Sequence, residues 1–207
     1  MNSEEKFFSE NNIDILKELG NIGTGQALGS LAKMINKRVS MPVPNVLLVE
    51  FQEVSNFVGG PENIIVGILV SISGDVNGIM MFLLQMESAH MLTDAVLGGM
   101  GQSTDPNEFT EMEISVIQEI GNIMISSYLG SLAGMINLKM RPSIPYMSID
   151  MANAILSVPA IEFGKVADRA LFIESKFSIE KVDVGGCFIF IPDMESLERI
   201  LNALGVG

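Results

Sequence analysis

The segment ELGNIGTGQALGSLAKMIN at residues 18–36 decides how the chain is organised, because much of it recurs as EIGNIMISSYLGSLAGMIN at residues 119–137. When residues 18–46 are aligned without gaps on residues 119–147, 13 of the 29 positions are identical. A second alignment pairs DVNGIMMFLLQMES, from Asp75, with DVGGCFIFIPDMES, from Asp183. Self-similarity over this length indicates a tandem duplication.

The duplication predicts the domain organisation. We expect one domain, residues 1–207, made of two homologous halves at about 11–100 and about 110–207. A chain of this length can bury a substantial core. The segment GMGQSTDPNEF at residues 99–109 is rich in turn-forming residues and is interpreted as a polar linker between the halves.

Each half is expected to begin with a long helix and to continue through short strands to a closing helix. Periodicity predicts helices over residues 12–36, 86–98, 111–137, 151–161 and 194–205. Apolar runs predict strands over residues 45–51, 63–72, 78–84, 146–150, 170–179 and 186–192. Because strands are grouped and separated by hairpin-sized gaps, we predict an α+β layered fold with a mainly antiparallel sheet, pseudo-two-fold symmetry and two long motif-bearing helices.

Composition and charge limit the classes of function. The formal net charge of −13 disfavours binding to nucleic acid and to anionic lipid. The longest apolar runs, residues 64–72 and 79–84, fall short of the roughly 18 to 20 residues of a membrane helix, so we expect no membrane insertion. The opening MNSEEKFFSENN is acidic where a secretory signal is basic and then apolar, which favours a cytoplasmic protein.

Most catalytic constellations are missing from the sequence. Cys187 is the sole cysteine and His90 the sole histidine, which excludes an internal disulfide, a multi-histidine metal site and a Ser-His-Asp system. Both residues are expected to be structural. The GNIGTG motif at Gly20 has the glycine order G-x-x-G-x-G and follows helical sequence, whereas a dinucleotide loop follows a strand, so we reject a dinucleotide site.

A polar stripe runs along both long helices. In the first copy Asp14, Glu18 and Asn21 fall at i, i+4 and i+7. The second copy repeats this spacing with Ser115, Glu119 and Asn122. A Glu and an Asn three residues apart lie about 5 to 6 Å from one another and can reach one small target together. Exposed Glu and Asn are also ordinary on helices, so the stripe alone leaves a structural and a functional interpretation open.

Two further features accompany the stripe in both copies. Gly20 and Gly121 lie between the Glu and the Asn and cost about 0.5 to 1 kcal/mol each relative to Ala in a helix. We interpret them as positions where the backbone of another macromolecule comes close. Pro44 and Pro145 each follow the Asn by 23 residues and are expected to fix the chain as it enters the next strand.

These residues resemble the motif Asp/Ser-x3-Glu-x2-Asn-x22-Pro of the CheC/CheX/FliY phosphatases of bacterial and archaeal chemotaxis. The resemblance covers essentially the whole chain, including EIGNI, the duplication and the final helix LERILNALG. CheX-type members typically keep one active motif, and FliY-type members add flagellar-switch segments for which 207 residues leave no room. The chain is therefore most similar to CheC-type members.

The resemblance implies a hydrolase that acts on the aspartyl phosphate of the response regulator CheY. It implies no cofactor of the chain's own, because the divalent metal is expected on CheY. Asn21 and Asn122 would each place a water in line with the P–O bond, which is catalysis by positioning. Glu18 and Glu119 would pair with a lysine beside the phosphoryl group. We predict two sites, of which the second is at least as active.

The resemblance also implies contacts beyond the reaction. Asp14 and Ser115 are expected to dock the substrate or to start the helices. CheD, the receptor glutamine deamidase, is expected to bind at SIDMANAI, where Asp150 would form a charged rim beside Met151 and Ile155, unless these two belong to the core. An alternative function is therefore a CheD-binding adaptor that sequesters the deamidase with little hydrolysis; a flagellar-switch component is disfavoured by length.

Overall fold

The protein is described from a computed structural model that covers residues 9–40, 45–50, 53–100, 103–163, 169–180 and 182–206. Its helices are α2 (Glu10–Ile35), α3 (Val54–Phe57), α4 (Met86–Leu97), α5 (Glu111–Ile136), α6 (Ala152–Phe163) and α7 (Met194–Ala203). Its strands are β1 (Val39–Ser40), β2 (Asn45–Glu50), β3 (Ile64–Gly74), β4 (Gly78–Gln85), β5 (Met140–Pro142), β6 (Tyr146–Met151), β7 (Arg169–Ile179) and β8 (Val182–Pro192).

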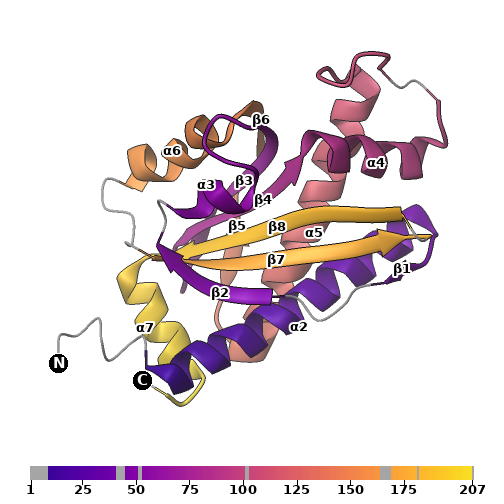
Figure 1. Cartoon of the computed structure of the whole chain (residues 1–207). Helices are drawn as coiled ribbons and strands as arrows, with labels where there is room; N and C mark the ends of the chain where they lie inside the picture. Colours follow the sequence, from indigo (N-terminus) through magenta and orange to yellow (C-terminus); the bar gives the residue numbers. More distant parts are fainter. Residues whose placement is uncertain are drawn as a thin grey trace.

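The strands form one antiparallel sheet in which the two halves meet (Figure 1). Over the described residues it has eight strands in the order β1-β7-β8-β4-β3-β5, with β2 also paired to β7 and β6 also paired to β3. The halves join at β4 and β8, where Phe82 lies opposite Phe188 and the ring centroids are 4.8 Å apart. The strand after each long helix pairs with the other half, so the halves are interwoven.

Helices cover both faces of the sheet because alternate strand residues point to opposite sides. In β3, Val66 and Ile68 belong to the main core, which lies between the sheet and α2, α4, α5 and α7. Ile65, the residue before Val66, points to the opposite face and belongs to a second core between the sheet and helices α3 and α6. Cys187 is a buried thiol in that second core, as expected from the sequence.

Each helix and strand expected from the sequence is present, with ends that differ by at most four residues. The predicted α+β fold with a mainly antiparallel sheet is confirmed. The sequence missed β1, β5 and α3, which have two, three and four residues and are too short to show a period.

Both long helices end in the same way, which accounts for one repeated residue. Asn36 and Asn137 follow the last residues of α2 and α5 with φ angles of 50° and 52°. Asn adopts this left-handed conformation more readily than most residues and often terminates helices. This repeated Asn is therefore explained by helix termination.

A buried carboxylate lies where the first half passes into the second. Glu113 is fully buried, and its carboxylate accepts hydrogen bonds from the backbone N–H groups of Thr110 at 2.9 Å and Ser103 at 3.1 Å. The Thr110 hydroxyl donates to the same carboxylate and accepts from the Glu113 backbone, which completes a capping box. Glu113 thus fixes both the beginning of α5 and the preceding turn.

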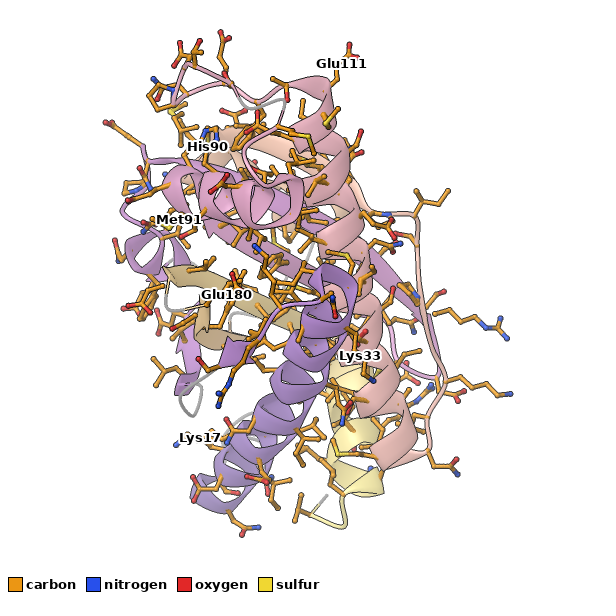
Figure 2. The ribbon with its side chains drawn as sticks, turned by 90° about the vertical axis from the view of Figure 1, so that its right-hand side faces the viewer. Lys17, Lys33, His90, Met91, Glu111 and Glu180 are labelled. Carbon is orange, nitrogen blue, oxygen red and sulfur yellow. The ribbon has the colours of Figure 1, made fainter. Side chains whose placement is uncertain are left out.

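His90 on α4 attaches to the same junction. Its Nδ1 lies 3.3 Å from Glu113 Oε1, its Nε2 lies 3.0 Å from the Pro106 carbonyl oxygen, and its ring stacks on Phe109. Figure 2 shows His90 beside the beginning of α5. His90 therefore has the structural role expected from the sequence, and it holds the polar linker against α4.

Candidate functional site

The predicted Glu and Asn residues lie along the outer surface of the two long helices. Glu18 on α2 and Glu119 on α5 are exposed, and neither side chain forms an ion pair or hydrogen bond within the part of the chain that the structure describes. Asn122 is also exposed, whereas Asn21 is half-buried. Each helix therefore presents a carboxylate and a carboxamide one turn apart, which can engage one small group on a partner.

Gly20 and Gly121 do not have the role expected from the sequence. Both are buried. A Cβ atom on Gly121 would lie 2.2 Å from Cδ1 of Ile68, so the missing side chain lets α5 pack closely on β3. The Gly20 carbonyl accepts a hydrogen bond of 2.9 Å from the buried Thr24 hydroxyl. The interpretation that Gly121 admits another macromolecule is wrong, and the burial of Gly20 argues the same for the first copy.

The two motif helices pack directly against each other (Figure 2). A Cβ atom on Gly23 would lie 2.7 Å from the fully buried Tyr128 ring, and the Ser127 hydroxyl donates to the Ser30 hydroxyl at 2.8 Å. Burial raises the pKa of Tyr128. Tyr128 occupies the position of Ala27 in the first copy, so this divergence between the copies reflects packing between the helices.

Asp14 and Ser115 lie on the exposed second turns of α2 and α5. Asp14 forms an ion pair of 3.4 Å with Lys17, and the Ser115 hydroxyl donates to the backbone carbonyl four residues earlier. The helices start at the caps Ser9 and Thr110, so a helix-start role for Asp14 and Ser115 is wrong. Substrate docking by these two residues stays a prediction.

The two Asn side chains have different surroundings. Asn122 Oδ1 accepts a hydrogen bond of 3.5 Å from the Ser126 hydroxyl. Asn21 Oδ1 is buried and finds no hydrogen-bond partner among the described residues. The first copy has Gly25 where the second has Ser126. Ser126 was not identified from the sequence as a candidate site residue. The difference between the two copies at this position is the signal that could have identified it.

The predicted partner-binding residue Asp150 lies on β6, which pairs with β3. Asp150 is exposed, and its carboxylate accepts a hydrogen bond of 2.7 Å from the Met151 backbone. Met151 is 45% exposed, but Ile155 is buried in the second core, so the expectation of an exposed apolar contact there is wrong for Ile155. Ile144 and Tyr146 are also exposed, at 90% and 62%.

The structure describes only one of the two predicted prolines. Pro145 directly precedes β6, where it limits the chain entering that strand. Pro44 lies outside the described residues.

The site offers a carboxylate and an amide at each helix. Within the described ranges, no cluster of three or more His, Cys, Asp or Glu side chains is arranged to hold a metal ion. None of the described helices has the length and apolar character needed to cross a membrane.

The fold and the site define an interwoven α+β protein with a Glu–Asn pair on each of two equivalent helices. The family model described as "CheC-like family" matches residues 12–48 and 112–149, which cover most of α2 and α5. The CheY-P phosphatase CheC of Bacillus subtilis (strain 168) is 30% identical over 200 residues, 96% of each chain. The chain belongs to the CheC-like family.

Solved structures agree with this assignment at the level of the fold. FliY of Thermotoga maritima has a TM-score of 0.74 and 19% identity, covering 96% of this chain and 98% of that chain. The structure of the CheX-CheY-BeF3-Mg2+ complex from Borrelia burgdorferi has a TM-score of 0.53 and 15% identity, covering 82% and 94%. At these identities the likeness shows the fold alone.

Proposed function

We propose that this protein hydrolyses the aspartyl phosphate of a CheY-type response regulator. The observation that carries the proposal is the presence of a Glu–Asn pair at equivalent surface positions of both α2 and α5. The name of the Bacillus subtilis relative supports the same substrate. The proposal implies a cytoplasmic location, where such regulators act.

The proposed role of the Asn residues is to orient water. An aspartyl phosphate is already activated, and the divalent metal is expected on the regulator, so the phosphatase has to supply a positioned nucleophile. An amide oxygen that accepts one water proton leaves a water lone pair directed at phosphorus. The amide does not titrate, so Asn122 can do this at any physiological pH.

The proposed role of the Glu residues is to engage a cation of the regulator. Glu18 and Glu119 are exposed and lack an ion pair among the described residues, so each carboxylate is available to a partner's lysine. Such a pair strengthens as docking excludes water, because the local dielectric falls. It would also orient the regulator so that the phosphoryl group faces the neighbouring Asn.

The direct test is phosphate loss from acyl-phosphorylated CheY in the presence of Mg2+. Substoichiometric amounts of this protein are expected to accelerate the loss in proportion to its concentration, because each molecule turns over repeatedly. Buffer without the protein is the control. A rate equal to that of the control would contradict the proposal.

A second function, a CheD-binding adaptor, is favoured by one observation. Tyr146, 62% exposed, lies on the same face of β6 as Asp150, because strand residues four apart point to the same side. Aromatic residues are enriched at the centre of protein interfaces, and charged residues are more typical of the polar rim. The two functions are compatible because this surface lies on β6, whereas the Glu–Asn pairs lie on α2 and α5.

Charge reversal tests the adaptor function. Asp150→Lys is expected to weaken CheD binding by about tenfold, because an interfacial charge of the wrong sign opposes association. Glu87→Lys on α4 makes the same change of charge at another exposed position and is expected to have no effect. Isothermal titration calorimetry measures both affinities. Equal affinities for Asp150→Lys and the unsubstituted protein would contradict a contact at this surface.

A further inference from the structure

The two Glu–Asn pairs differ in what holds the amide. On α5 the Ser126 hydroxyl, one turn after Asn122, donates to Asn122 Oδ1 at 3.5 Å, and both residues are exposed. On α2 the equivalent position is Gly25, which has no hydroxyl, and Asn21 Oδ1 is buried without a partner among the described residues. The duplicated helices therefore carry the same Asn in two different states.

This difference bears on how each amide can orient water. An amide oxygen has two lone pairs, so Asn122 Oδ1 can accept from Ser126 and still accept from a water. The hydrogen bond restrains the carboxamide at the helix surface before the regulator arrives, which reduces the reorganisation needed during the reaction. Asn21 must turn its buried oxygen outward before it can accept a water proton.

We propose that Ser126 is a positioning residue for Asn122 and that it makes the second copy the faster of the two sites. Gly25 leaves the first copy without this restraint. The inference rests on the proposed phosphatase function, and it concerns the rate of the bound complex, because Ser126 is argued to act through Asn122.

The first experiment isolates the second site. In an Asn21→Ala background, Ser126→Ala is expected to lower kcat by about three- to tenfold, the range given by one hydrogen bond, with KM unchanged. Ser126→Thr keeps a hydroxyl and is expected to restore most of the rate. Alanine has a high helix propensity and Ser126 is exposed, so circular dichroism should show an intact fold for Ser126→Ala.

The second experiment transfers the feature to the first site. In an Asn122→Ala background, Gly25→Ser is expected to raise kcat by a similar factor. Apart from the neighbouring backbone of its own helix, a Cβ atom on Gly25 would meet no atom within 4 Å, so there is room for an added side chain. Gly25→Ala is the matched control, because it adds the same Cβ and helix propensity without the hydroxyl, and it is expected to leave kcat unchanged.

The outcomes separate this inference from the proposed function. If the unsubstituted protein does not accelerate phosphate loss, the function and the inference both fail. If it does, and Asn122→Ala slows it while Ser126→Ala does not, the inference alone is overturned. A rise in KM without a fall in kcat for Ser126→Ala would also overturn it, since that result indicates a docking contact. A fall in kcat that Thr reverses supports it.

Discussion

The double variant Asn21→Ala/Asn122→Ala is expected to lower kcat for dephosphorylation of CheY by about 100-fold, which is the effect of misplacing a reacting group by roughly 1 Å. The Ala methyl group has neither a donor nor an acceptor, so water reaches the phosphoryl group without orientation. Because Glu18 and Glu119 are retained, docking should persist and KM should change little. Stopped-flow or phosphate-release measurements on the purified variant give both constants.

Asn202→Ala is the matched control for this variant. Asn202 is exposed near the end of α7, and its substitution removes the same amide from a helix surface outside the Glu–Asn pairs. Its rate should equal that of the unsubstituted protein. A double variant that retains full kcat would contradict the water-positioning role of both Asn residues, even if the protein is a phosphatase.

Replacing Glu113 with Ala is expected to reduce the free energy of unfolding by about 3 kcal/mol, because buried N–H donors lose a charged acceptor. The Thr110 and Ser103 backbones both donate to this carboxylate, and His90 lies against it. Urea unfolding followed by circular dichroism measures the loss. Glu111→Ala, two residues earlier and exposed, is the control and should cost no more than about 1 kcal/mol through the helix dipole.

The same carboxylate makes stability depend on pH in a defined direction. Burial by itself raises the pKa of Glu113, but the hydrogen bonds from Thr110, Ser103 and His90 outweigh burial, and the pKa lies below its ordinary value of 4.5. Because the pKa of Glu113 is lower in the folded state than in the unfolded state, its ionised carboxylate stabilises the fold. This stabilisation is fully present above the pKa of the unfolded state and is lost as the pH falls through the pKa of the folded state. The stability difference between the unsubstituted protein and Glu113→Gln should therefore be constant above about pH 5 and shrink in more acidic solution. A difference that grows on acidification would contradict this.

Some of the site could be read from the sequence because it depends on spacing alone. Glu and Asn three residues apart on a helix share a face wherever the helix packs, and a repeat preserves that relation. The same reasoning failed for Gly121, because whether a missing side chain serves a partner or the core depends on what lies opposite. Ile68, more than fifty residues earlier in the chain, lies there, and no local pattern connects the two.

The sequence by itself determined the long helices, the main strands and the two Glu–Asn pairs, because periodicity and capping act between residues close along the chain and the duplication shows the same pattern twice. The tertiary structure alone decided how these parts are combined. It pairs β2 with β7 and β6 with β3, and it buries Glu113 against the first half. These features arise from contacts between distant segments, whose free energies depend on burial and complementary shape and not on sequence spacing.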